Sequence, residues 1–253
     1  MKKRSSLFIL AAAAVMLSLG MPASAGKMDA RIVNSARQSY VFKNYLQGDD
    51  IRIDSKEGAV TLTGVISEEF HKSLAEITLT DIRGVKSVDN RLEVKGSSPT
   101  ANSDAWLHDK VKATLLFHRS VRAGGTEVLV KDGIVTLRGN AVNTAQKDLT
   151  TEYSRDVEGV KDVINEMTVA PAPEKTPQTT SEKIDDVSVA ALVRMALLLH
   201  HSTSGLNASV AAKRGVVTVE GRARTAAEKE LVTKVVKDVN GVKSVKNLMI
   251  IKE

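Results

Sequence analysis

The stretch KDGIVTLRG at residues 131–139 decides the fold, because the chain contains two further versions of it with the same internal spacing. These versions are KEGAVTLTG at 56–64 and KRGVVTVEG at 213–221. After each copy, a third glycine follows twenty residues beyond the second, and an asparagine follows six residues later. Three copies in one register identify an internal repeat. We expect its recurring positions to be structural: Gly58, Gly64, Gly84 and Asn90; Gly133, Gly139, Gly159 and Asn165; Gly215, Gly221, Gly241 and Asn247.

Each repeat has the pattern of a helix, two strands, a helix and a third strand. In the quoted stretch a glycine turn precedes Val135 and Leu137, which alternate with Thr136 and so predict a half-buried hairpin strand. The third glycine of each repeat ends the second helix. A right-handed crossover then places the third strand parallel to the second. We therefore predict an α+β fold of three tandem αββαβ sandwiches, each a three-stranded mixed sheet with two helices on one face.

The repeats also set the predicted domain boundaries. Residues 1–25 resemble a signal peptide, with a basic start, an apolar run and small residues before cleavage near Ala25. The predicted domains span 26–95, 104–170 and 183–253. The linker at 96–103 is short, whereas the Pro/Thr-rich linker at 171–182 is stiffened by three prolines. We expect the first two domains to be neighbours and the third to be held apart.

Composition narrows the class of protein. The absence of cysteine excludes disulfides, thiol catalysis and a lipid-modified N-terminal cysteine. No apolar run after the signal is long enough to predict a transmembrane segment in the mature chain. Removal of the signal lowers the formal net charge from +6 to +3. The excess lies in residues 183–253, which carry 12 basic and 7 acidic residues.

The repeated motifs resemble the BON domain (bacterial OsmY and nodulation) family. Two segments of each repeat show this resemblance. The first is the hairpin strand, at 58–64, 133–139 and 215–221, and the second is the later segment, GVKSVDN at 84–90, GVKDVIN at 159–165 and GVKSVKN at 241–247. The resemblance implies an αββαβ sandwich, a periplasmic location and a non-enzymatic role in the envelope or in osmotic stress. It implies phospholipid surfaces or periplasmic proteins as ligands. The chain departs from the two-domain members by its third domain, and from the lipoprotein members by its lack of an anchoring cysteine.

Basic substitutions distinguish the third repeat. An arginine replaces the hairpin acids Glu57 and Asp132, and others replace uncharged residues beyond the second strand. Because the hairpin turn and the loop after that strand lie at opposite ends of the sheet, these cations form a stripe at best. A solvated basic face remains the alternative. The candidate lipid-binding residues are Arg214, Arg222, Arg224, Lys234 and Lys246.

Three apolar residues are candidates for a partner face. In the third repeat Leu248 and Ile250 stand where the other repeats have charged or polar residues, so another repeat, a partner or lipid must cover them. The single tryptophan, Trp106, begins a leading helix and suits either the edge of the core or a membrane interface.

The sequence gives little support for catalytic or metal-ligating residues. No histidine column is filled in all three repeats, and no Ser-His-Asp or phosphate-loop motif stands out, so we predict no enzyme, metal or cofactor. The recurring asparagines satisfy backbone groups more readily than they serve as catalytic amides. The acids Asp81, Asp156 and Asp238 recur near Lys86, Lys161 and Lys243 and predict local ion pairs at each turn.

The sequence thus predicts a non-catalytic periplasmic envelope or stress protein. It would bind anionic phospholipid surfaces, chiefly through its basic third domain. The alternative is a chaperone-like or protein-interaction module that uses the open sheet faces. An export signal and a small net charge argue against nucleic acid as the partner.

Overall fold

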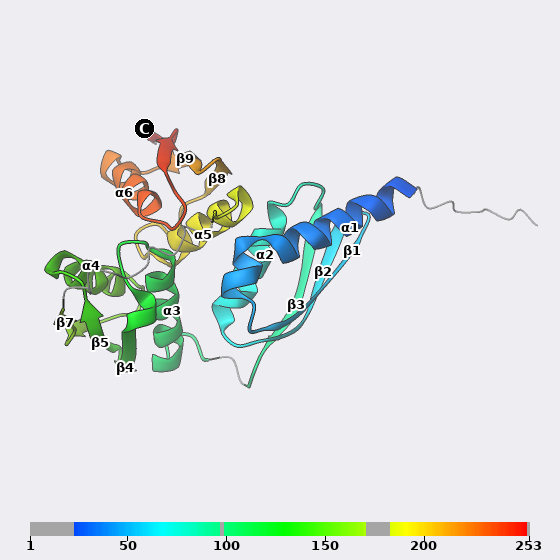
Figure 1. Ribbon diagram of the computed structural model, residues 1–253. Helices are drawn as coiled ribbons and strands as arrows, with labels where there is room; N and C mark the ends of the chain where they lie inside the picture. The colour runs from blue at the N-terminus through cyan, green and yellow to red at the C-terminus, as the bar shows by residue number, and fades with distance from the viewer. Residues whose placement is uncertain (1–22, 97–98, 171–182, 252–253) are drawn as a thin grey trace, which may run out of the picture.

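The computed structural model describes residues 23–96, 99–170 and 183–251, which form three αββαβ domains (Figure 1). The first domain consists of α1 (Ala23–Gln38), a π-helical turn η1 (Val41–Tyr45), β1 (Asp50–Lys56), β2 (Ala59–Ile66), α2 (Glu69–Thr80) and β3 (Ser87–Val94). Its sheet has the order β1-β2-β3, with β1 antiparallel and β3 parallel to β2. This is the predicted mixed sheet.

The second and third domains repeat this topology with an interrupted third strand. The second contains α3 (Asp104–Phe117), η2 (Ala123–Gly125), β4 (Thr126–Lys131), β5 (Ile134–Ala141), α4 (Thr144–Arg155), β6 (Asp162–Asn165) and β7 (Thr168–Val169). The third contains α5 (Asp186–Leu199), β8 (Ala208–Lys213), β9 (Val216–Ala223), α6 (Ala226–Lys237), β10 (Ser244–Asn247) and β11 (Ile250–Ile251). The pieces β6 and β7 both pair with β5, and β10 and β11 both pair with β9.

An asparagine side chain accounts for the interruption. The Oδ1 atoms of Asn165 and Asn247 accept hydrogen bonds from the backbone N–H groups of Met167 and Met249, at 2.9 and 3.0 Å. In the first domain the corresponding bond from Leu92 is 3.3 Å long and the strand continues without a break. The tighter side-chain bond locally competes with the regular strand ladder.

An acid on each leading helix ties that helix to the hairpin, and in the second and third domains this acid lies in the first turn. Asp104 accepts hydrogen bonds from the backbone N–H groups of Asp132 and Gly133, at 2.8 and 2.9 Å. The bonds to Gly133 and Asp132 hold the pKa of Asp104 below its ordinary value. The hairpin turn has positive φ at both central residues, 53° at Asp132 and 81° at Gly133, which defines a type I′ turn. Asp29 and Asp186 accept hydrogen bonds from the corresponding turns of the other domains.

The third domain is not held apart, contrary to the prediction. One hydrophobic core contains the buried side chains of both the first and third domains and also Phe117 from the second. Most of the second domain's buried side chains form a separate core. The ribbon shows α5 lying between the first domain and the rest of the third (Figure 1). The proline-rich linker that precedes the third domain therefore does not keep this domain away from the first.

The recurring acids contact side chains of other domains. This corrects the prediction that they form local ion pairs with the lysines after each turn. Asp81 lies 2.7 Å from the Nη1 atom of Arg194 on α5. Asp156 lies 3.2 Å from Nε2 of His200, and Asp238 lies 3.5 Å from Nδ1 of His118. Each acid ends a helix, where the macrodipole disfavours a negative charge, so a positive or hydrogen-bonding partner is needed.

The contacts between the second and third domains are reciprocal. The backbone N–H of Arg119 donates to the carbonyl of Asp238, and that of His201 donates to the carbonyl of Asp156, both at 2.9 Å. Isolated β-bridges join His118 to Val239 and Val157 to His200. Because each domain supplies the end of its leading helix and the end of its second helix, the pair is approximately twofold symmetric.

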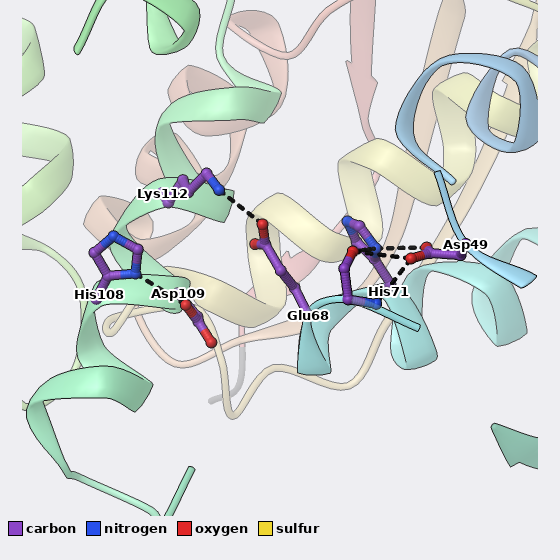
Figure 2. Close-up of polar contacts among 7 residues, drawn as sticks. Asp49, Glu68, His71, His108, Asp109 and Lys112 are labelled. Atoms are coloured by element: carbon purple, nitrogen blue, oxygen red, sulfur yellow. Dashed lines mark hydrogen bonds and ion pairs between the residues drawn. The ribbon is translucent and has the colours of Figure 1, made fainter. Parts of the chain in front are cut away.

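The first domain spans this pair with α2. At its start, Glu68 binds Nζ of Lys112 on α3 at 2.7 Å, as Figure 2 shows. At its end, Asp81 binds Arg194 on α5. Lys112 and Arg194 occupy the same position in their repeats. The helix α2 therefore joins equivalent cations on the two domains of the pair.

Candidate functional site

The recurring glycines and asparagines are part of the scaffold. The Nδ2 atoms of the asparagines donate to the backbone carbonyls of Lys72, Lys147 and Lys229 on the second helix of each repeat, at 2.8 to 2.9 Å. Each amide thus links the third strand to a helix and leaves no group free for chemistry. The glycine Gly64 shows why no side chain is tolerated there, since a Cβ would lie 1.8 Å from the carbonyl oxygen of Asp50.

The five basic candidates do not converge. Arg214 lies in the β8–β9 turn, and Lys234 lies on α6, 3.3 Å from Glu230. Arg224 binds Glu228 at 2.7 Å, and this bond lowers the pKa of Glu228. Only Arg222 and Lys246 lie on the open face of the sheet, on β9 and β10.

Leu248 and Ile250 lie on that same open face. Lys246 pairs with Thr218 and Ile250 pairs with Arg222 in the parallel register, and side chains in register on neighbouring strands share a face. Leu248 and Ile250 are 57% and 59% exposed, so the described parts of the other domains do not cover them. We define the basic sheet face as Lys213, Arg222, Lys246, Leu248 and Ile250.

The basic sheet face differs in charge from the other open faces. Its strands contribute three basic residues and one acid, Glu220, to the solvent side. The corresponding face of the first domain carries three basic and four acidic residues. An anionic surface would therefore be attracted to the third domain more than to the first.

Trp106 is not part of this surface. It is half-buried near the start of α3 in the second domain, and Nζ of Lys110 lies 3.8 Å from the centre of its ring. Burial lowers the pKa of Lys110. The structure thus places Trp106 on a helix, whereas Leu248 and Ile250 lie at a sheet edge in another domain.

Sequence reasoning missed a second apolar surface. Leu129, Ile134 and Ile164 lie on the open face of the second domain's sheet and are 38% to 48% exposed. The alternation on β4 and β5 places all three outward, a signal that the sequence already contained.

One Ser, His and Asp set does occur, in the first domain. Asp49 Oδ2 lies 2.6 Å and Ser67 Oγ lies 3.3 Å from the same atom, Nδ1 of His71 (Figure 2). Ser67 Oγ also donates to Asp49 Oδ1 at 2.8 Å. A catalytic relay needs the serine and the acid on opposite ring nitrogens. This arrangement fits a partly buried hydrogen-bond network at the start of α2.

The described residues show neither a metal-binding cluster nor a membrane-spanning helix. Residues 23–96, 99–170 and 183–251 contain no group of three or more His, Cys, Asp or Glu side chains placed to hold a metal ion. Within the same ranges, none of the helices has the length and apolar character required to cross a bilayer.

The curated proteins that are similar to this chain include the following two. The Osmotically-inducible protein Y of Escherichia coli (strain K12) is 27% identical over 143 residues, which cover 55% of this chain and 71% of that protein. The Outer membrane lipoprotein DolP of Haemophilus influenzae is 31% identical over 112 residues, which cover 44% of this chain and 58% of that protein.

Among solved structures, the CdsD structural protein of the type III secretion system of Chlamydia trachomatis matches 88% of this chain and 94% of its own, at 17% identity and a TM-score of 0.23. That score is too low to support a conclusion about fold or function. The sequence model of the BON domain matches residues 29–96, 103–171 and 185–253. With three αββαβ units in these same segments, the chain belongs to the BON domain family.

Proposed function

We propose that this protein is a non-catalytic component of the bacterial envelope that binds anionic phospholipid surfaces through the basic sheet face of its third domain. The observation that carries the proposal is the position of Arg222 and Lys246 beside the exposed Leu248 and Ile250 on one open face. Cations beside apolar side chains suit the boundary between headgroups and acyl chains.

The relatives support the setting of this proposal. One carries osmotic induction in its name and the other is named an outer membrane lipoprotein. A periplasmic location also requires the export signal predicted at residues 1–25, most of which lies outside the described residues. We therefore propose export of the protein to the periplasm together with lipid binding.

The expected affinity is low. Arg222 and Lys246, the two cations of this face beside Leu248 and Ile250, contribute about 1 kcal/mol each near an anionic surface. Burial of the exposed halves of Leu248 and Ile250 adds about 1 kcal/mol each. A sum of about 4 kcal/mol corresponds to a dissociation constant near 1 mM, so attachment by this face alone is weak and reversible.

Co-sedimentation of the full chain with phosphatidylglycerol vesicles tests the proposal. We expect binding that weakens with salt, falls in the charge-reversed variant Arg222→Glu/Lys246→Glu, and persists in the control Arg52→Glu/Lys56→Glu on the first domain's open face. Failure of the unmodified chain to bind at millimolar lipid, or equal losses in both variants, would refute it.

A second candidate function is a chaperone-like or protein-interaction role. The exposed Leu248, Ile250 and Ile251 favour it, because apolar side chains left open on a sheet can hold unfolded clients. Suppression of client aggregation should then be insensitive to salt and should be lost in Leu248→Thr/Ile250→Thr. Equal protection by that variant would exclude this site.

A further inference from the structure

A cleft of about 250 Å³ opens at one end of the third domain's sheet. The turn before β8 and the end of β9 form its walls, and Ile250 lies beside Arg222 in the strand register. The cleft therefore adjoins the basic sheet face. Its lining residues are Gly205, Leu206, Asn207, Arg222, Ala223 and Arg224.

The two arginines of the cleft are held differently. Arg224 donates from Nε and Nη2 to one carboxylate oxygen of Glu228, at 2.9 and 2.7 Å, and its backbone N–H donates to the other oxygen. These bonds fix the guanidinium, and no residue in the described chain accepts a hydrogen bond from its Nη1 atom. Arg222 is exposed and has no ion-pair partner among the described residues.

The rest of the cleft leaves room for a ligand. A Cβ atom placed on Gly205 would meet nothing within 4 Å, and the φ of Gly205 lies outside the positive range. Neither the space at this wall nor the backbone conformation therefore requires a glycine. The remaining lining is neutral. Guanidinium groups recognise phosphate through paired N–H donors, so two of them at a neutral cleft suit a single phosphate group.

We propose that this cleft binds the phosphate of an anionic phospholipid headgroup. The phosphate would lie between Arg222 and Arg224, and the acyl chains would pass over the neighbouring Ile250 and Leu248. This inference rests on the proposed function, and it replaces general attraction to a basic face with a defined site. The adjacent exposed apolar side chains favour a lipid over free phosphate as the source of the group.

Two variants of the full chain test the site against phosphatidylglycerol vesicles diluted in phosphatidylcholine. Gly205→Val adds an apolar side chain at one wall of the cleft without a change of charge, and Gly124→Val is its control, because Gly124 is equally open but lies in the second domain. Arg222→Gln removes one charge, and Arg52→Gln is its control. We expect each cleft variant to lower the vesicle partition coefficient about fivefold, as for the loss of one basic residue, and the controls to leave it unchanged.

The outcomes separate this inference from the proposed function. If Arg222→Gln weakens binding and Gly205→Val does not, the cleft is not the site although the basic sheet face still binds lipid. If the unmodified chain does not bind the vesicles, the function itself fails. Melting temperatures of all four variants establish that they fold.

A second measurement does not depend on the variants. Short-chain phosphatidylglycerol, titrated below its micelle concentration, should shift the amide resonances of Gly205, Arg222 and Arg224 at concentrations where inorganic phosphate does not. Equal shifts with inorganic phosphate would show that the cleft takes the free ion and would overturn the assignment to lipid. Absence of shifts with both probes would overturn the site.

Discussion

Replacement of Asp238 by alanine should open the contact between the second and third domains. This carboxylate accepts hydrogen bonds from the hydroxyls of Tyr153, at 2.5 Å, and Ser120, and its side chain is 14% exposed. His118, itself buried, stacks on Tyr153 with 3.9 Å between ring centroids. Loss of the carboxylate leaves two partly buried hydroxyls without their acceptor and removes the negative charge that lies 3.5 Å from Nδ1 of His118.

The size of the effect follows from these contacts. Leaving a buried hydrogen-bonding group without its partner costs about 1–3 kcal/mol, and Asp238 is the acceptor for two hydroxyls. Taking about 3 kcal/mol, the open population rises on the order of 150-fold. Asp156→Ala is the matched control, because that carboxylate occupies the same place in the repeat but is 49% exposed. Its loss should cost about 0–1 kcal/mol.

Amide hydrogen exchange measures the opening directly. The backbone N–H groups of Arg119 and Asn240 donate across the interface to the carbonyls of Asp238 and Phe117, at 2.9 and 3.0 Å. Their exchange should accelerate by about two orders of magnitude in Asp238→Ala and by less than tenfold in the control. Equal acceleration in both variants would refute the reasoning, because exposure would then not decide the cost.

The same network fixes the pH range of the contact. Burial raises the pKa of Asp238, but the neighbouring imidazole of His118 and hydrogen bonds from Ser120 and Tyr153 outweigh it and hold the pKa below its ordinary 3.8. Its contribution is therefore present above pH 3.8 and is lost as the pH falls through the lowered value. Burial and Asp238 raise the pKa of Tyr153 above its ordinary 10.0, so the contribution of its hydroxyl is lost only at still higher pH. Exchange at Arg119, corrected for its intrinsic rate, should be flat between these limits.

Three further changes test the scaffold. Arg214 has φ of 55° in the β8–β9 turn, so Arg214→Asn should raise the free energy of unfolding by up to about 1 kcal/mol, measured by urea denaturation; no gain would show that the turn is unstrained. Asn247→Ala removes the hydrogen bonds to α6 and should lower the free energy of unfolding by about 2 kcal/mol, or Tm by about 4–8 °C. Its control Ser244→Ala should leave the stability unchanged, and equal losses of stability in both variants would exclude the hydrogen bonds as the cause. A chain that begins at Gly26 should keep its Tm, because the next buried side chain along α1 is that of Ile32; a lower Tm would contradict this.

The architecture of each domain could be predicted because its signals are local. The glycine turns, the alternation of Val135 with Leu137 and the glycines after the second helices act over a few residues, and three copies confirm one another. The tie from Asp104 to the hairpin was missed because it joins residues 28 and 29 positions apart with no local pattern. Only the recurrence of an acid in the same column of all three repeats could have revealed it.

The contacts between domains could not be predicted from the linker, because its proline content determines its stiffness and not the packing of the domains that it joins. A helix that is apolar on every side is normally buried on every side. The helix α5 has this character: Ala190, Leu192 and Met195 are all buried, on different sides of it. That pattern indicated cover by another domain, whatever the stiffness of the linker.

The candidate site could be predicted only in part. The strand alternation placed Leu248 and Ile250 outward, and the structure agrees. The five cations were grouped by their presence in the third repeat, but Lys234 lies on α6 and Arg214 lies in the β8–β9 turn, at the other end of β9 from Arg222. Which cations share a surface depends on three-dimensional neighbours that spacing does not specify.

The packing of α5 has a practical consequence for work on separated domains. A fragment of residues 183–253 would expose the face of α5 that the first domain covers and would leave Arg194 without Asp81. Such a fragment would adhere to vesicles, to unfolded clients and to itself through a surface that the intact chain never presents. The repeat is modular as a sequence, but the smallest unit with native surfaces is the whole three-domain chain.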